Sequence, residues 1–144
     1  NLKVAVIKHA SHKFDIDHPA KDSYKIRKAG AQQILISSQK RWALLNENTP
    51  NNSELTLEDA LQHITVESID FIIVEGFKSA PINKIEIFRP ALGKSLISAT
   101  DKYVIAIATD EPCQINTQLP LLNLNSPEQI AEFIEQFLNN FPCN

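Results

Sequence analysis

The sequence predicts an α/β protein with a doubly wound, mostly parallel sheet. Three observations lead to this prediction: apolar runs typical of buried strands, helical patterns between them, and a final strand-then-helix unit with clear boundary signals. The chain has 144 residues, the usual size of one domain, and we expect residues 1–144 to form a single one. Its 43% hydrophobic and 22% charged content is typical of a globular protein.

The first half of the chain alternates strand and helix patterns. Residues 4–7 form a β-branched run typical of a strand buried on both faces. Gly30 suits the end of a helix, because glycine readily adopts a positive φ. The predicted elements are a strand at 4–7, a polar loop at 9–19, a helix at 21–29, two hairpin strands at 33–37 and 41–45, and a surface loop at 46–53.

The second half has stronger boundary signals. Thr56 with Asp59 three residues later predicts a capping box at a helix start. Ser126 as N-cap, Pro127 as first helical residue and Gln129 as capping-box partner predict the start of the last helix. The predicted strands lie at 71–74, at 84–89 as a half-exposed edge strand, at 103–108 and at 121–124.

Composition narrows the classes of function. The net charge of −3 gives no general attraction to nucleic acid, so we expect no nucleic-acid partner. No apolar run is long enough to span a membrane. Cys113 and Cys143 match no metal-ligand spacing, which predicts free thiols in a cytoplasmic protein. The sequence contains no methionine and opens on Asn1, so we expect that something has been removed, either the initiator methionine alone or a longer segment.

Ligands of wound sheets bind at the carboxyl ends of the strands, which directs attention to the residues that follow each strand. Glu75 follows the most apolar strand and precedes Gly76, a place where a carboxylate holds or orients nucleotide-bound magnesium. The alternative is a strand-ending glutamate in a solvated turn. Lys8 and His9 follow the first strand, and Thr109 and Asp110 follow the strand at 103–108.

The loop and helix after the first strand combine carboxylates with cations, as a magnesium–phosphate site requires. Asp15 and Asp17 lie in the loop, and Lys21 and Asp22 stand at the helix start. Further along the helix, we interpret Lys25 and Lys28 as a solvated face. A zinc site would use two histidines and two carboxylates at irregular spacing, which is a weak pattern. Its ligands would be His9, His12, Asp15 and Asp17.

Two further residues admit two interpretations each. Asp110 can accept hydrogen bonds from N1–H and the exocyclic amine of guanine, and such paired polar contacts discriminate by a factor of roughly 10⁴ in favourable cases. The other interpretation is a turn aspartate before Glu111 and Pro112. Trp42 could stack on a ligand or mediate a dimer contact, but we expect it in the core.

Several separate segments together resemble the B protein (MobB) family of molybdopterin-guanine dinucleotide biosynthesis. The similarity covers essentially the whole chain and includes its final helix. The segments that carry it are Lys8-His9, 17–24 (Asp-His-Pro-Ala-Lys-Asp-Ser-Tyr), 27–31 (Arg-Lys-Ala-Gly-Ala), 39–44 (Gln-Lys-Arg-Trp-Ala-Leu), 74–78 (Val-Glu-Gly-Phe-Lys) and 108–110 (Ala-Thr-Asp).

The resemblance implies a phosphate-loop NTPase-like fold and a GTP-binding accessory protein with weak GTPase activity. It also implies magnesium with GTP, a guanylyltransferase partner (MobA-type) and a homodimer formed through additional strands. By similarity, Asp17 and Glu75 are metal ligands, and Asp110 reads guanine. The expected nucleotide-binding residues are Lys8, His9, Lys21, Asp22, Gly76, Lys78, Thr109 and Asp110. No catalytic residue is assigned.

The sequence also departs from that family. The family begins with a strand, a Gly-x-x-Gly-x-Gly-Lys-Thr-type loop and a helix, and we expect all three to be absent from this sequence, which favours a longer missing segment before Asn1. The three glycines here, Gly30, Gly76 and Gly93, form no such loop. Ala20 replaces the usual glycine and Ser11 a common histidine. We therefore expect this chain to bind GTP poorly. The alternatives are a nucleotide-independent dimeric scaffold for the guanylyltransferase and a magnesium-dependent ligase similar to dethiobiotin synthetase.

Overall fold

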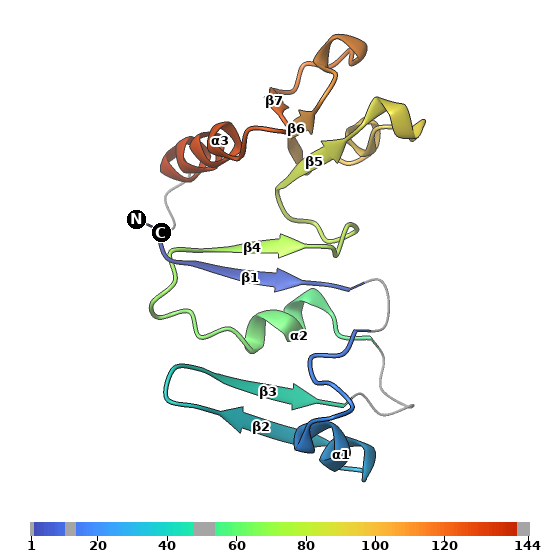
Figure 1. Ribbon diagram of the computed structural model, residues 1–144. Coiled ribbons are helices and arrows are strands. Elements are labelled where there is room, and N and C mark those ends of the chain that lie inside the picture. The colour runs from blue at the N-terminus through green and yellow to red at the C-terminus, as the bar shows by residue number, and fades with distance from the viewer. Residues whose placement is uncertain (1, 11–13, 48–53, 141–144) are drawn as a thin grey trace. The chain divides into compact units, whose positions relative to one another are not determined.

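The computed structural model describes residues 2–10, 14–47 and 54–140. Ser11 and His12, most of the predicted surface loop and Cys143 therefore lie outside the described residues. Figure 1 shows the elements, which are β1 (Val4–Lys8), α1 (Asp22–Lys28), β2 (Gln33–Ser37), β3 (Trp42–Asn46), α2 (Leu57–Gln62), β4 (Phe71–Glu75), β5 (Lys84–Phe88), β6 (Val104–Thr109), β7 (Leu121–Asn123) and α3 (Pro127–Asn140), with short 3₁₀ turns at Pro90–Leu92, Ile97–Ala99 and Pro112–Gln114.

The chain divides into two compact units, residues 1–80 and 81–144. That residues 1–144 act as one domain stays a prediction. The expected parallel pairing is confirmed, but the described strands form three separate sheets: parallel β1–β4, antiparallel β2–β3, and parallel β5–β6–β7. One continuous sheet would need hydrogen bonds between these groups, and in the described residues β4 pairs only with β1 and β5 only with β6.

In the first unit, β1 and β4 lie side by side in register, so that Lys8 pairs with Glu75 at their carboxyl ends. Helix α2 packs on one face, where Ile7 and residues of α2 are buried together. On the other face Val4 and Val6 are 40% and 60% exposed. The prediction that residues 4–7 are buried on both faces is therefore wrong, because α2 covers only one face of this strand.

Local sequence signals set the helix ends. Thr56 and Asp59 form the predicted capping box of α2, in which each backbone N–H donates to the other's side chain at 3.2 and 3.1 Å. Helix α1 ends at Lys28, and Gly30, two residues later, has a φ of +105°. The N–H groups of Gly30 and Ala31 donate to the carbonyls of Arg27 and Ile26, which satisfies the last turn of the helix.

Strands β2 and β3 form the predicted antiparallel hairpin, in which Leu35 pairs with Leu44 and Ser37 with Trp42. Partners in an antiparallel pair share one face, and alternate residues along each strand do too, so Leu35, Leu44 and Trp42 lie together. Trp42 is 70% exposed, which makes its predicted core position wrong. The hairpin has α1 beside it but keeps this apolar face exposed.

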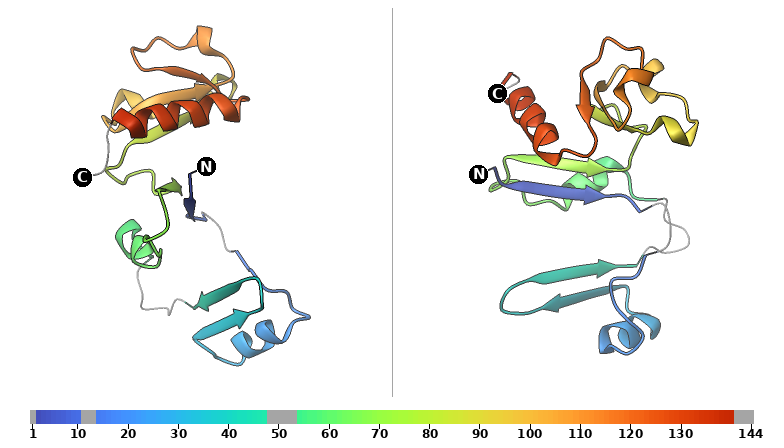
Figure 2. Two further views of the ribbon diagram at one scale, coloured as in Figure 1. Left: turned by 90° about the vertical axis from the view of Figure 1, so that its left-hand side faces the viewer. Right: turned by 45° about the horizontal axis from the view of Figure 1, so that its top comes forward.

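In the second unit, β6 is buried on both faces as predicted, with Ala106, Ile107 and Ala108 fully inaccessible. Helix α3 covers one face through Ile130 and Phe133, and Figure 2 shows it lying along this sheet. The other face carries Glu86, which pairs in register with Ile107. Among all the residues that the structure describes, no helix is long and apolar enough to cross a membrane.

Two details of this unit differ from expectation. Strand β5 is at the edge of its sheet as predicted, but its Glu86 is buried while Ile87 is 58% exposed. The Glu86 carboxylate accepts the N–H groups of Ile97 and Ser98 at 2.6 and 2.9 Å, which explains its burial. In α3, the Gln129 side chain accepts the N–H of Asn123 at 2.6 Å instead of closing a capping box.

Candidate functional site

The carboxyl ends of β1 and β4 bring together a predicted nucleotide-binding lysine and a predicted metal ligand. Lys8 Nζ donates to both carboxylate oxygens of Glu75, at 2.7 and 2.8 Å. The two side chains are 65% and 64% exposed, so water screens the pair and it contributes at most about 1 kcal/mol to folding. Because this contact is weak, a metal ion or a phosphate group can replace either partner at little cost.

His9 and Gly76 extend this site by one residue on each strand. The N–H of His9 donates to the carbonyl of Glu75 at 2.8 Å. The His9 ring lies 4.6 Å from the Phe77 ring, and its Nε2 is 2.7 Å from a Glu54 oxygen. Gly76 and Phe77 both adopt positive φ, at +95° and +47°. For Phe77 this backbone conformation is strained, and strained residues are common at ligand-binding turns.

Lys78 follows this turn and is exposed, as are Lys21 and Asp22 at the start of α1. Asp22 lies 3.4 Å from Lys25 of the same helix, with both side chains well exposed. Lys25 and Lys28 are exposed, as the predicted solvated face requires. Lys21 and Asp22 are exposed to solvent, and no described hydrogen bond or ion pair joins either of them to Glu75. Their nucleotide-binding role therefore stays a prediction.

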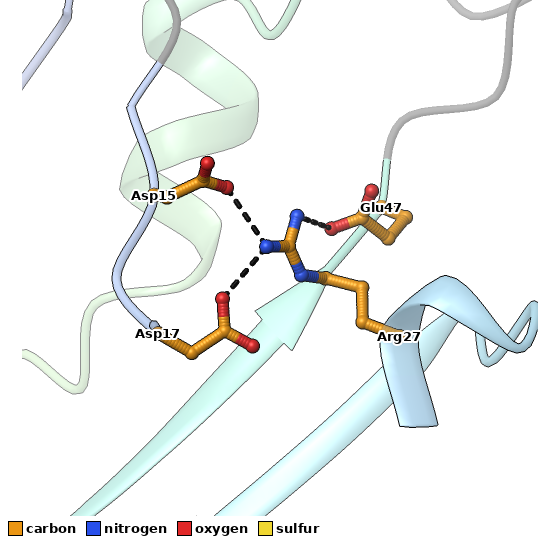
Figure 3. A network of polar contacts seen from close by, with 4 residues as sticks. All are labelled: Asp15, Asp17, Arg27 and Glu47. Atoms are coloured by element: carbon orange, nitrogen blue, oxygen red, sulfur yellow. Dashed lines mark hydrogen bonds and ion pairs between the residues drawn. The ribbon is translucent and has the colours of Figure 1, made fainter. Parts of the chain in front are cut away.

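Asp17 belongs to a different arrangement, which we call the Arg27 cluster: Arg27, Asp15, Asp17 and Glu47 (Figure 3). Arg27 Nη2 donates to Asp15 Oδ1 at 2.8 Å and to Asp17 Oδ1 at 2.7 Å, and Nη1 lies 3.5 Å from Glu47 Oε1. The Arg27 side chain is 11% exposed and that of Asp17 only 4%. The cluster ties the loop to helix α1 and to the end of the hairpin.

The hydrogen bonds of this cluster are incomplete. Asp17 Oδ2 and Arg27 Nε are both buried without a hydrogen-bond partner among the described residues. An unsatisfied buried polar atom costs about 1–3 kcal/mol, and more for a charged group. The hydrogen bond to Asp17 and then that to Asp15 nonetheless raise the pKa of Arg27 above its ordinary value, against the lowering effect of burial. The guanidinium therefore stays charged, and the orphaned carboxylate oxygen suits a further cation.

In the second unit, Thr109 is the last residue of β6 and Asp110 follows it, so both lie at the predicted strand end. The Thr109 side chain is almost fully buried, and its Oγ1 accepts the N–H of Glu111 at 3.2 Å, so it caps a turn. Asp110 Oδ2 lies 3.4 Å from Arg89 Nε, with side chains 32% and 50% exposed. Arg89 and Asp110 meet because they follow strands β5 and β6, whose last residues pair.

The structure thus brings Lys8, His9, Glu75 and Gly76 together, while Asp17 lies in the Arg27 cluster. Among the described residues, no group of three or more His, Cys, Asp or Glu side chains is placed to hold a metal ion. Magnesium does not need such a group, because it is usually bound by one or two carboxylates together with substrate phosphates and water. Glu75 and Asp17 supply oxygen ligands of the type that magnesium prefers.

Sequence reasoning missed Arg27 and Glu47 as partners of the predicted metal ligand. The hairpin register contained a signal: Gln33 pairs with Asn46, and the N–H of Glu47 donates to the carbonyl of Gln32 at 2.9 Å. That register places Glu47 near the carboxyl end of α1. The path of the loop that brings Asp15 and Asp17 to the same guanidinium has no comparable signal in the sequence.

Comparison with known proteins gives consistent matches. Residues 1–110 match the family Molybdopterin guanine dinucleotide synthesis protein B. The chain is 41% identical over 140 residues to the molybdopterin-guanine dinucleotide biosynthesis adapter protein of Escherichia coli, an alignment that covers 95% of this chain and 77% of that protein. It is 38% identical over 141 residues to the protein of the same name from Haemophilus influenzae, covering 98% and 76%.

Solved structures support the fold. A crystal structure of molybdopterin-guanine biosynthesis protein B matches with a TM-score of 0.62 and 23% identity, covering 96% of this chain and 82% of that one. The crystal structure of Bacillus subtilis MobB matches with a TM-score of 0.63 and 22% identity, covering 94% and 80%. At this identity the likeness concerns the fold, which is the mixed α/β fold with parallel strands described above.

Proposed function

The chain belongs to the molybdopterin-guanine dinucleotide synthesis protein B family, and from this premise we propose that it is a GTP-binding accessory protein of molybdenum cofactor biosynthesis. Its relatives from Escherichia coli and Haemophilus influenzae are named as adapter proteins of molybdopterin-guanine dinucleotide biosynthesis. As an adapter protein of this kind, the chain would assist the guanylyltransferase of the pathway. The observation that carries the proposal is the pairing of Lys8 with Glu75 at the ends of two parallel strands.

Magnesium with GTP is the proposed ligand of this site. Glu75 would hold or orient the metal, and Lys8 would pass from the Glu75 carboxylate to a phosphate oxygen. Both groups are solvent-exposed, so this exchange has a low cost. When bound, magnesium supplies the positive charge that neutralises the phosphate oxygens. Gly76, whose φ is +95°, forms the turn that directly follows Glu75.

Asp110 is the proposed reader of guanine. Its contact with Arg89 is long, at 3.4 Å, and its side chain is one-third exposed. A guanine base offers N1–H and an exocyclic amine to such a carboxylate, whereas adenine offers no N1–H donor. We therefore expect Asp110→Asn to reduce the preference for GTP over ATP, with Glu111→Gln as the neighbouring control that retains it.

Calorimetry tests GTP binding directly. The sequence contains only three glycines and no phosphate-loop pattern, and that loop supplies the backbone cradle for the phosphates. We expect magnesium–GTP to bind this chain with a dissociation constant well above the micromolar range. Micromolar affinity for this chain alone would contradict the idea that the phosphate loop dominates binding.

A nucleotide-independent dimeric scaffold is the second candidate function. The exposed hairpin face of Leu35, Trp42 and Leu44 favours it, because contiguous apolar surface marks protein contacts. A homodimer through this face is part of the proposal. A pull-down with purified guanylyltransferase separates the two candidates: retention without any nucleotide supports the scaffold, and retention that requires GTP supports the GTP-dependent adapter.

A further inference from the structure

The Arg27 cluster contains one guanidinium among three carboxylates (Figure 3). Arg27 bonds Asp15 and Asp17 through the same nitrogen, Nη2, and approaches Glu47 through Nη1. Asp17, the second proposed metal ligand, therefore already has a cation at 2.7 Å in the structure. A magnesium ion that binds the same carboxylate must come close to this guanidinium. Because both are cations, they repel each other.

The cluster is also unbalanced in charge and in hydrogen bonds. Three carboxylates against one guanidinium leave a formal charge of −2, so the cluster attracts a further cation. Asp17 Oδ2 and Arg27 Nε are buried and have no partner in the described parts of the chain. An ion pair with such unsatisfied atoms is less stable than a fully hydrogen-bonded one. A divalent cation can therefore replace Arg27 as the partner of the Asp17 carboxylate.

We propose that Arg27 sets the divalent-cation affinity of Asp17, as an internal counter-ion that magnesium must displace from the carboxylate. This inference rests on the proposed function, because it extends the magnesium proposed at Glu75 to Asp17, the second metal ligand that the family resemblance implies. In the metal-free protein Arg27 holds the loop of Asp15 and Asp17 against α1 and the hairpin. In the metal-bound protein the divalent cation takes over the Asp17 carboxylate, and Arg27 keeps Asp15 and Glu47.

A titration of the ¹⁵N-labelled chain with Mn²⁺, without nucleotide, tests the proposal. Paramagnetic Mn²⁺ broadens the amide signals of residues near its binding site, so the signals of residues 15–17 report binding at Asp17. We expect Arg27→Gln to lower the Mn²⁺ concentration that broadens these signals about tenfold, the effect of losing one charge-assisted hydrogen bond. Arg27→Lys keeps the positive charge but lacks the planar guanidinium. The Mn²⁺ concentration that it requires should lie between those of the wild type and Arg27→Gln.

Two matched variants separate charge competition from loosening of the loop. Lys25→Gln removes the same charge from the same helix, but from a side chain 68% exposed that contacts Asp22, so it should leave the titration nearly unchanged. Glu47→Gln removes one negative charge from the cluster and should raise the required Mn²⁺ concentration. A loosened loop would instead make both Arg27→Gln and Glu47→Gln bind more tightly, which would overturn the proposal.

Two other outcomes would also overturn it: an Arg27→Gln chain that needs as much Mn²⁺ as the wild type or more, and loop signals that never broaden in any variant. Neither outcome bears on the nucleotide site at Lys8 and Glu75, which the GTP calorimetry tests separately. Conversely, absence of GTP binding would leave a positive Mn²⁺ result for Asp17 intact. Failure of the inference and failure of the proposed function are therefore distinguishable.

Discussion

A Cβ atom placed on Gly76 would come within 2.7 Å of the Cβ of His9 and 3.1 Å of its carbonyl oxygen. The turn after β4 therefore packs directly against the residue after β1. Gly30 offers a matched comparison, because its φ of +105° is close to the +95° of Gly76 but its Cβ would meet nothing within 4 Å. Both positive φ values would strain an alanine, and of the two glycines Gly76 alone also has a close neighbour at the Cβ position.

We expect Gly76→Ala to destabilise the first unit more than Gly30→Ala does. The positive φ alone costs an alanine about 1–2 kcal/mol, and the steric overlap with His9 adds about 1–3 kcal/mol. Hydrogen exchange of the amides in β1 and β4, compared with those in α1 and the hairpin, measures the loss in each part. Equal losses for the two variants would show that the contact with His9 is unimportant.

The ion pair of Lys84 with Asp101 predicts an acid-dependent loss of stability in the second unit. The hydrogen bond from Lys84 and then that from the N–H of Tyr103 hold the pKa of Asp101 below its ordinary value of 3.8. A carboxyl group whose pKa is lowered by folding stabilises the protein above pH about 4, and this contribution is lost as the pH falls through the folded-state pKa.

Urea unfolding, followed by the amide signals of β6, checks this prediction. Asp101→Asn should unfold at a lower urea concentration than the wild type at pH 7, and the difference should shrink below pH about 4. A difference between the two proteins that stays constant from neutral to acid pH would contradict the assignment. Asp70→Asn is the comparison variant, because it also removes a hydrogen-bonded carboxylate but from the first unit. The Asp70 carboxylate accepts the N–H of Lys3 at 2.6 Å.

The exposure of Trp42 allows a test of the proposed homodimer. Its side chain is 70% exposed on a face that also carries Leu35 and Leu44. Truncation of an aromatic side chain at the centre of an interface costs about 2 kcal/mol or more, roughly thirtyfold in the dissociation constant. Light scattering should therefore show a shift from dimer to monomer for Trp42→Ala.

Phe14→Ala is the matched control, because Phe14 is also 70% exposed but lies outside the hairpin. It should leave the mass in solution unchanged. A wild-type chain that is monomeric throughout the concentration range, or a Trp42→Ala chain that stays dimeric, would contradict a dimer formed by the hairpin face.

Features encoded by residues close in sequence could be predicted well. Thr56 and Asp59 are three residues apart, so the pattern alone indicates their capping box, and Gly30 marks the end of α1 for the same reason. The meeting of Lys8 with Glu75 was also predictable, because parallel strands present their carboxyl ends at one edge.

Features that depend on what covers a surface could not be predicted. Trp42 has an ordinary strand pattern around it, and only the arrangement of neighbouring elements decides that it is exposed. Glu86 is buried because the N–H groups of Ile97 and Ser98 reach it across a turn, which an alternating pattern cannot indicate. The Arg27 cluster likewise joins three segments, and of its members the sequence predicted only Asp15 and Asp17 as site residues.

A magnesium–GTP titration of the labelled chain tests the central claim most directly. The signals of His9, Gly76 and Lys78 report the strand-end site, and Glu75→Gln removes the proposed metal ligand with little change of shape. We predict weak but saturable shifts of these signals that require magnesium and are lost in Glu75→Gln. Signals that stay unchanged with magnesium–GTP, or that shift equally in Glu75→Gln, would contradict a nucleotide site at Lys8 and Glu75.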